Sequence, residues 1–342
     1  MRVKVAYCGI CGSDIHEYLG GPIFSPQPGQ KHPRTGVSLP VVMGHEISGT
    51  IAELGDEVKN LFTGQKVTII PLMGDSQYGT SPCVSCLTGR PNTCKQATFY
   101  GFSAPGGGFA DEIVVNQANI VPIPDKVPLK IAALSEPLAV ALHMVRTSGY
   151  VLGQNILVLG AGPIGLALLM ILKAKGAGKV IVSEVSPLRI QYAQQLGADK
   201  VVNPLDGGTI ASAVPLNPVL AAVKELTVEG VDIAYEASGL QTTLDTAIAA
   251  VMPGGLVFNV AVHEKPLHVN INDFVIGEKK MTGGISYTLQ DFQGVLELLS
   301  SEAIPAYKMI SSVVPLSNVI EGGFHELINN KTKHVKILIQ AK

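Results

Sequence analysis

Apolar and polar positions follow different patterns in the two parts of the chain. From about residue 150 to residue 287, short apolar runs alternate with amphipathic stretches of helical period: NILVLG precedes IGLALLMILKAKG, and KVIVSE precedes PLRIQYAQQLG. Further strands are supplied by KVVNP, VDIAYEAS, GLVFNV and MTGGIS. Apolar strands that alternate with helices are typical of βαβ units, so this region predicts a doubly wound parallel sheet of the α/β class.

The first part of the chain has the pattern of an irregular, mostly antiparallel β domain. Residues 1 to about 125 are rich in Gly and Pro and contain short β-type runs such as VVMGHEISGTIAELG, KVTIIP and FADEIVV. The run KHVKILIQ also alternates like a strand, and we expect it to return to this domain. We therefore predict one domain over 1–149, completed by 288–342, and a second over 150–287. Residues 20–40 form a long loop rich in Pro and Gly, and such loops are often functional.

Length, charge and hydropathy set the broad class of the protein. A chain of 342 residues is long enough for two domains with separate cores. The formal net charge is -2 and no stripe of Lys and Arg stands out, so we expect no nucleic-acid partner. The most apolar run, from Ile156 to Leu172, contains the turn Gly160 to Pro163, which would break a membrane-spanning helix. We therefore expect no membrane segment.

The spacing of the cysteines indicates metal binding. The chain has 5 cysteines, with Cys8 and Cys11 in one C-x2-C pair, Cys83 and Cys86 in another, and Cys94 after them. The first residues lack the charged segment and apolar segment of a signal peptide. In a chain that is not secreted, this spacing points to a metal before it points to disulfides. We expect a reduced, cytoplasmic compartment.

A glycine-rich pattern predicts a dinucleotide site at the start of the second domain. The pattern G-x-G-x-x-G follows the strand NILVLG directly and opens a helix; its residues are Gly160, Ala161, Gly162, Pro163, Ile164 and Gly165. The first glycine permits a tight turn, the second lets a pyrophosphate approach the backbone, and the third lets the helix pack closely on the strand. A Gly-rich turn without a ligand is the less common outcome in this context.

Two further residues bear on the choice of cofactor. Glu184 ends the next strand, where a carboxylate would hydrogen-bond the hydroxyls of the adenosine ribose. Since this carboxylate would repel a 2′-phosphate, we expect NAD rather than NADP. Arg189 would either lie over the adenine or be an ordinary solvated residue of the following helix.

Two short clusters in the first domain carry possible metal ligands. Cys11 and His16 lie in CGICGSDIH, and His45 and Glu46 lie in GHE. A thiolate, an imidazole and a carboxylate, with water as the fourth ligand, would make a zinc site with the open position that distinguishes catalytic from structural sites. Each residue alone would more often be part of the core. Their occurrence together with a dinucleotide domain favours the metal site.

Several segments resemble the zinc-containing medium-chain dehydrogenase/reductase family. They are GICGSDIH, GHEISGTIAELG, GGFADEIVV, SEPLAVALH and LGAGPIGL, and the similarity covers essentially the whole chain in the family's order. The long loop before PVVMGHE and the stretch YGFSAPGGGFA are most similar to the polyol branch that contains the 2,3-butanediol dehydrogenases. The resemblance implies a GroES-like catalytic domain, a Rossmann coenzyme domain and an active site in the cleft between them.

The resemblance also implies roles for individual residues. Cys11 and His45 would be zinc ligands, with either Glu46 or Glu136 of SEPLAV as the third. Ser13 would hydrogen-bond the substrate oxygen, and His16 would pass the proton on to solvent. Members of the family suggest a homodimer or homotetramer, with an exposed edge strand of the coenzyme domain as the contact.

The sequence departs from the family pattern at two places. Family members usually carry a further segment before the first strand, so we expect an N-terminal strand and part of the packing of the catalytic domain to be absent. The family's structural zinc lobe has four cysteines; Cys83, Cys86 and Cys94 fit the last three positions, and Thr80 stands at the first. A neutral Thr is a poor ligand and structural sites are almost always closed by four, so we expect this lobe to be empty or weak, with Asp75 an unfavoured substitute.

Together these features predict a zinc-dependent, NAD-linked oxidation of a vicinal diol or secondary alcohol to a ketone, and the reverse reaction. The expected pair is 2,3-butanediol and acetoin. A sorbitol or xylitol dehydrogenase is the nearest alternative, because it would differ only in the substrate pocket. A zinc-free, NADPH-dependent quinone or enoyl reductase of the same fold is disfavoured by Cys11, His45 and Glu184. A non-catalytic NAD-binding sensor or structural protein is the alternative from another class, and it would show no zinc-dependent rate.

Overall fold

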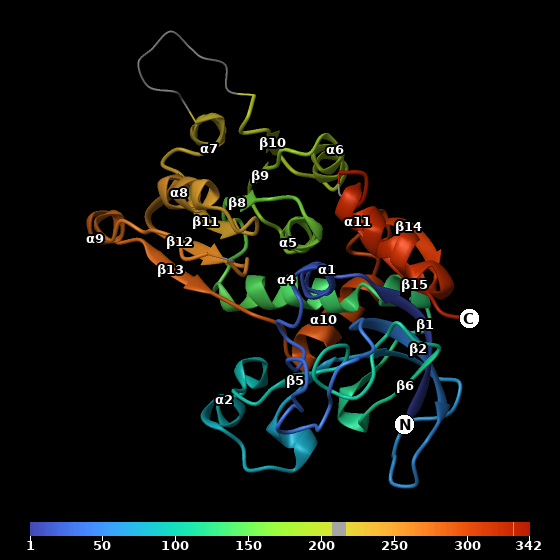
Figure 1. The fold of residues 1–342 in the computed structure, drawn as a ribbon. Coiled ribbons are helices and arrows are strands. Elements are labelled where there is room, and N and C mark those ends of the chain that lie inside the picture. The colour runs from blue at the N-terminus through green and yellow to red at the C-terminus, as the bar shows by residue number, and fades with distance from the viewer. Residues whose placement is uncertain (207–216, 264, 331) are drawn as a thin grey trace. The chain divides into compact units, whose positions relative to one another are not determined.

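The computed structural model describes residues 1–206, 217–263, 265–330 and 332–342 (Figure 1). It divides into two compact units, which we call unit 1 (Met1–Ala139 with Ser286–Lys342) and unit 2 (Val140–Ile285). The division falls inside helix α4 (Ser135–Thr147), earlier than the change of sequence pattern near residue 150 suggests. Within the described part of the chain, no helix is long and apolar enough to cross a membrane.

Unit 1 is built around a seven-stranded, mostly antiparallel sheet. In spatial order its strands are β14 (Ile310–Pro315), β15 (Lys336–Gln340), β1 (Arg2–Gly9), β2 (Glu46–Glu53), β3 (Lys66–Ile69) and β7 (Ile120–Pro122), and β6 (Glu112–Val114) also pairs with β1. Val3 and Val5 of β1 are buried while Arg2 and Lys4 are exposed, as expected for a sheet with one face on the core. The run KHVKILIQ forms β15, which pairs with β1 and so returns to this unit, as expected.

Short elements surround this sheet. The helices of unit 1 are α1 (Gly12–Gly20), α2 (Val84–Leu87), α3 (Leu129–Ala132), α10 (Leu289–Ser300) and α11 (Glu326–Asn329). Strands β4 (Leu72–Met73) and β5 (Thr98–Phe99) form a separate pair. Helix α10 begins after Thr288, whose backbone N–H and hydroxyl both donate to the Asp291 carboxylate, so the start of the helix is capped.

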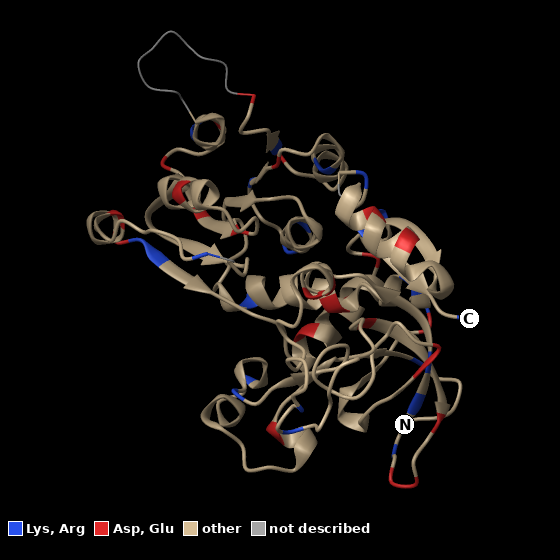
Figure 2. Cartoon of the chain, viewed as in Figure 1, with Lys and Arg blue, Asp and Glu red and all other residues tan. Residues whose placement is uncertain are grey.

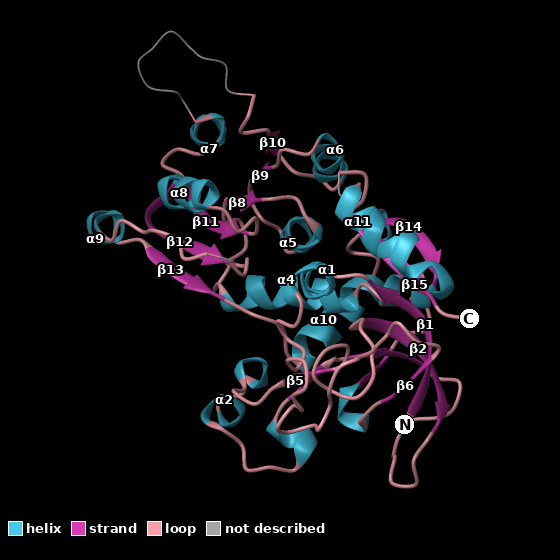
Figure 3. Ribbon diagram, in the orientation of Figure 1, coloured by secondary structure: helices cyan, strands magenta, loops and turns pink. Residues whose placement is uncertain are grey.

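Unit 2 is the doubly wound parallel sheet that the sequence predicts. Its six strands lie in the order β10 (Lys200–Val202), β9 (Val180–Ser183), β8 (Ile156–Leu159), β11 (Val231–Glu236), β12 (Val251–Asn259) and β13 (Lys280–Gly283). Helices α5 (Pro163–Ala174) and α6 (Pro187–Gln195) cover one face, and α7 (Pro218–Leu226) and α8 (Gln241–Ala250) cover the other (Figure 3). Helix α9 (Asn272–Gly277) lies between β12 and β13 in the chain. The order of the strands reverses between β8 and β11, and ligands of such sheets bind beyond the carboxyl ends of the strands at this point.

Charged side chains do not gather on one element. Lys and Arg are scattered over both units and are interspersed with Asp and Glu (Figure 2).

Candidate active site

The glycine-rich turn of unit 2 has the geometry of a phosphate cradle. Gly160 directly follows β8 and has a φ of 98°, a conformation that favours glycine. A Cβ atom at Gly165 would collide with the carbonyl oxygen of Gly160, so helix α5 can approach the strand only because residue 165 lacks a side chain. Gly162 precedes Pro163 and caps α5 without a side-chain hydrogen bond. The first N–H groups of the helix are therefore available to an anion.

Glu184 and Arg189 both face this turn. Glu184 is buried, and its carboxylate accepts hydrogen bonds from the backbone N–H of Ala161 at 2.7 Å and from those of Val185 and Ser186 at 2.8 and 2.9 Å. The Nη1 atom of Arg189 lies 4.0 Å from the point where a Cβ of Gly162 would be. The structure thus brings the predicted cofactor residues together around one turn, and Arg189 is half-buried beside it instead of fully solvated.

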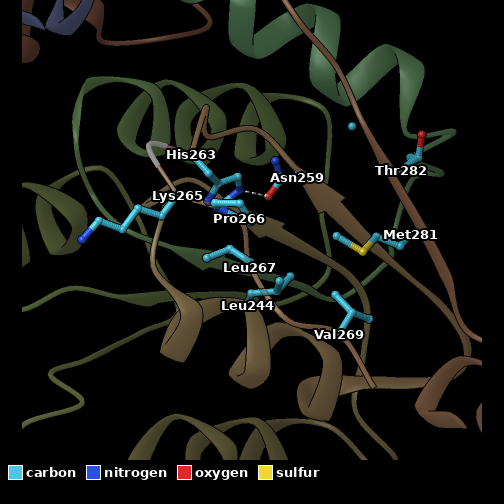
Figure 4. Close-up of a pocket in the computed structure, with 10 residues that line it drawn as sticks. Leu244, Asn259, His263, Lys265, Pro266, Leu267, Val269, Met281 and Thr282 are labelled. Carbon is cyan, nitrogen blue, oxygen red and sulfur yellow. Dashed lines mark hydrogen bonds between the residues drawn. The ribbon is translucent and has the colours of Figure 1, made fainter. Parts of the chain in front are cut away.

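A cavity of about 700 Å³ lies at the carboxyl ends of β12 and β13 (Figure 4). Oδ1 of Asn259, the last residue of β12, accepts a 2.9 Å hydrogen bond from Nε2 of His263. Leu244, Leu267 and Met281 supply apolar walls, and the Lys265 side chain extends away from them. This cavity was not predicted from the sequence, because its lining comes from one helix, one loop and two strands.

In unit 1, Asp14 fixes two of the predicted metal ligands. Cys11 precedes α1, and its backbone N–H donates to Oδ2 of Asp14 at 2.9 Å. The other carboxylate oxygen of Asp14 faces Nδ1 of His45 at 3.4 Å. Burial alone would lower the pKa of His45, but Asp14 and Cys11 raise it well above its usual value. Because Asp14 faces Nδ1, the other ring nitrogen of His45, Nε2, points to the opposite side, where the hydroxyl of Ser13 lies 3.5 Å away.

Among the described residues, only one of the two carboxylate oxygens of Glu46, the first residue of β2, has a hydrogen-bond partner. Its Oε1 atom accepts a 2.6 Å hydrogen bond from the ammonium of Lys336, and both side chains are almost completely buried. Its Oε2 atom is buried and has no hydrogen-bond partner among the described residues. A Cβ atom on Gly9 would collide with this oxygen, so the carboxylate occupies the space that a side chain at residue 9 would need.

The donor set of this site fits zinc. Cys11, His45 and Glu46 each offer one ligand atom, and these atoms lie within 4.8 Å of one another. The unpartnered Oε2 of Glu46 is the kind of buried polar atom that a cation would satisfy, and a sulfur, nitrogen and oxygen set leaves a fourth position open. The predicted ligands Cys11, His45 and Glu46 are therefore brought together by the fold.

The other predicted groups lie around this set. Glu136 is buried at the start of α4 but is not one of the three clustered ligands. Burial raises the pKa of Glu136 to about 7, with opposing contributions from His45 and Glu46. The buried hydroxyl of Tyr287, whose pKa is raised well above its usual value by burial and then by Glu136, was not predicted from the sequence. His16 is exposed on α1.

A second cluster forms in the predicted structural-zinc lobe, and Asp75 completes it. Ligand atoms of Asp75, Cys83, Cys86 and Cys94 lie within 4.8 Å of one another. Thr80, at the position of the missing cysteine, instead accepts a 2.7 Å hydrogen bond from Arg34.

The carboxylate of Asp75 is fixed in this lobe by two donors. Its Oδ1 accepts from Arg34 at 2.8 Å, and its Oδ2 accepts from the backbone N–H of Cys83 at 2.8 Å. These donors hold the pKa of Asp75 well below its usual range, so the group stays ionised. Three thiolates and one carboxylate give the four protein ligands of a structural zinc site. This arrangement favours a lobe that binds zinc, whereas Thr80 in place of a cysteine had suggested an empty or weak site.

Two family models match the chain. The alcohol dehydrogenase GroES-like domain matches residues 1–125, and the zinc-binding dehydrogenase domain matches residues 163–301. The (R,R)-butanediol dehydrogenase of Saccharomyces cerevisiae is 38% identical over 352 residues, which cover 98% of this chain and 90% of that protein.

Solved structures agree with this assignment. The crystal structure of 2R,3R-butanediol dehydrogenase from Bacillus subtilis superposes with a TM-score of 0.89 and 37% identity, covering 100% of this chain and 92% of that one. An alcohol dehydrogenase from Escherichia coli CFT073, solved with NADH, has a TM-score of 0.84 and 26% identity over 99% of this chain and 91% of its own. The chain therefore belongs to the zinc-binding alcohol dehydrogenases, the zinc-containing enzymes of the medium-chain dehydrogenase/reductase family.

Proposed function

We propose that this enzyme oxidises a vicinal diol to a hydroxyketone with zinc and NAD, and catalyses the reverse reduction, with 2,3-butanediol and acetoin as the pair. The observation that carries the proposal is the buried Oε2 atom of Glu46, which has no hydrogen-bond partner among the described residues and lies beside the ligand atoms of Cys11 and His45. The same chain has the glycine-rich turn that binds dinucleotides. The relatives that are butanediol dehydrogenases support the choice of substrate.

Cys11, His45 and Glu46 would hold the zinc, which as a Lewis acid makes a substrate hydroxyl more acidic. The hydroxyl of Ser13 lies 3.5 Å from Nε2 of His45, close enough to the metal ligands to hydrogen-bond the substrate oxygen and to relay its proton by giving up its own. His16, exposed on the same helix, would release the proton to solvent. The turn at Gly160–Gly165 would bind the pyrophosphate of NAD, Glu184 would bind the ribose and Arg189 would contact the cofactor beside Gly162.

The surroundings of the metal ligands suit a small diol with apolar ends. The ring of Phe102 lies 5.0 Å from the His45 imidazole, and Phe24 packs on Phe102 at 5.4 Å. Glu136 and Tyr287 supply buried polar groups that could bind the second oxygen of a diol. A substrate with one hydroxyl would make no use of these two groups, so we expect it to bind less well than a diol.

We also propose a second zinc ion in the lobe of Asp75, Cys83, Cys86 and Cys94. This site would be structural, since four protein ligands leave no open position. The free thiols that it requires fit a reduced, cytoplasmic compartment.

We propose that the enzyme is a homo-oligomer joined through β13. This strand ends the sheet of unit 2, and all four of its residues are exposed. Ile271, Val275, Ile276 and Met281 are large exposed apolar residues on or next to it in the chain. An open strand edge with apolar neighbours favours pairing with another copy, and an antiparallel pair of identical strands is self-complementary.

The test of the proposed activity is NADH formation by the purified enzyme with stereoisomers of 2,3-butanediol, with butan-2-ol, and with sorbitol and xylitol. We expect the highest kcat/KM with a butanediol stereoisomer and loss of the rate on treatment with a chelator, restored by added zinc. A higher kcat/KM with sorbitol or xylitol would replace the diol by a longer polyol. Equal values for butan-2-ol would contradict the role of the second oxygen. NAD binding without turnover would indicate a sensor.

A further inference from the structure

We propose that Lys336 is a positioning residue for the metal site: it holds Glu46 as the third ligand and so keeps Glu136 off the metal. The inference rests on the proposed zinc function. It concerns a residue outside the sequence motifs, at the start of β15.

The ammonium of Lys336 joins the two segments that carry the metal ligands. It donates to Oε1 of Glu46 at 2.6 Å and to the carbonyl oxygen of Ile10, the residue before Cys11, at 3.0 Å. The backbone of the same strand reinforces this link, because the N–H of Ile10 donates to the carbonyl oxygen of Ile337 at 3.0 Å. One cation therefore fixes the spacing between Cys11 and Glu46.

The strand register explains how Lys336 reaches Glu46. Strand β1 lies between β2 and β15, and Gly9 of β1 pairs with Glu46 on one side and with Leu338 on the other. Lys336 is two positions from Leu338 and so lies on the same face of β15. Because Gly9 has no side chain, the carboxylate and the ammonium can meet over the strand between them.

The contact leaves Glu46 only one way to bind a metal. Lys336 occupies Oε1, so Oε2 is the atom left to coordinate, and the carboxylate would bind through a single oxygen. Asp14, Glu46 and Glu136 are three buried acids in this region. Lys336 pairs with Glu46 in particular, and this contact keeps the Glu46 carboxylate turned so that Oε2 stays beside the other ligand atoms. Without Lys336, Glu46 could rotate and Glu136 would compete for the metal.

The experiment replaces zinc with cobalt(II), whose visible spectrum reports the ligands, in the parent enzyme and in K336M, K336R and the control K66M. Lys66 is matched to Lys336 because it lies in the same unit and its ammonium also donates to backbone carbonyls, those of Asp125 and Val127, without an acidic partner in the site. We expect K336M to change the cobalt spectrum and to speed metal loss to a chelator about tenfold or more, since partners of metal ligands typically contribute that much. K336R should restore much of the parent behaviour, and K66M should match the parent.

A double-mutant cycle separates positioning of Glu46 from a general effect on the fold. The loss of metal affinity caused by K336M should largely disappear in an E46Q background if Lys336 acts through Glu46. An equal loss in both backgrounds would overturn the inference. If K336M does not fold, G9A provides an independent test, because it displaces Glu46 and leaves Lys336 in place; an unchanged cobalt spectrum in G9A would also overturn it. A parent enzyme that binds neither cobalt nor zinc would instead contradict the proposed function itself.

Discussion

At the residue scale, Asp14 shows how one buried acid can organise a metal site without touching the metal. Its two oxygens face the backbone N–H of Cys11 and the ring of His45, so it sets both the position of the thiol and the orientation of the imidazole. Residues in this position relative to metal ligands often matter almost as much as the ligands.

Replacing Asp14 with Ala should therefore weaken both folding and metal binding. We expect D14A to lose about 1–3 kcal/mol of stability in the metal-free enzyme, because the partly buried N–H of Cys11 loses its acceptor. Zinc affinity should fall about 10- to 100-fold. Thermal unfolding of the metal-free enzyme and competition with a chelating dye would measure the two effects. D56A, at an exposed turn, is the control; parent-like zinc affinity in D14A would refute the role of Asp14.

Glu184 allows a second test at this scale, on the choice of cofactor. E184Q keeps the shape of the side chain but removes the charge that would repel a 2′-phosphate and bind the ribose hydroxyls. We expect kcat/KM for NAD to fall about tenfold or more, as for loss of a charged hydrogen bond, and the preference for NAD over NADP to narrow. If the ratio of kcat/KM with NAD to kcat/KM with NADP did not change, Glu184 would only accept hydrogen bonds from the backbone N–H groups around it and would not select the cofactor.

Sequence reasoning found the residues that lie in short motifs and missed those that meet through the fold. Cys11, His45 and Glu46 could be named because thiol, imidazole and carboxylate occur in two short segments, which the fold then brings together. Lys336 could not be named, because it meets Glu46 across 290 residues of sequence and looks like an ordinary strand residue. Tyr287 gave no signal either, since its hydroxyl becomes important only through burial beside Glu136.

At the element scale, the parallel sheet was the most predictable part of the molecule. Strand β8 is a continuous apolar run, β9 is apolar up to its last residue, Ser183, and β11 is apolar apart from Asp232 and Glu236, so these short strands could be recognised between the longer segments. The zinc lobe was less predictable, because its fourth donor comes from a separate turn. Asp75 lies in the 3-10 turn Asp75–Tyr78, before the cysteine segment, and only the fold places its carboxylate beside the three cysteine thiols.

The zinc content of the enzyme tests this lobe. We expect about two zinc ions per chain in the parent and about one in D75A, since three thiolates alone leave the structural site open. The diol activity of D75A should fall less than its zinc content, because among the described residues the four ligands of the lobe form a group separate from Cys11, His45 and Glu46. Elemental analysis against D56A as the control would decide. One zinc per chain in the parent would restore the expectation of an empty lobe.

At the scale of the whole molecule, the proposed association through the open edge of β13 can be tested by mutation. We expect I276K and M281K, alone or together, to shift the enzyme from an oligomer towards a monomer, because each would bury a charge in the contact. Ile276 and Met281 have exposed fractions of 85% and 43%, and Val228, at 97% on the same unit, provides the control V228K. Sedimentation velocity would measure the masses. An oligomer that persists in both variants would place the contact elsewhere.

The position of β15 also has a consequence for the order in which the chain folds during its synthesis. Unit 2 is one continuous segment, from Val140 to Ile285, whereas the sheet of unit 1 joins β1 to a strand far along the chain, with Lys336 and Ile10 separated by 326 residues. Domains fold as units as the chain emerges from the ribosome, and distant pairings form late. We therefore expect the nucleotide-binding unit to be complete while Cys11 and Glu46 still lack their lysine, so that the nascent enzyme acquires its capacity to bind NAD before its capacity to retain zinc.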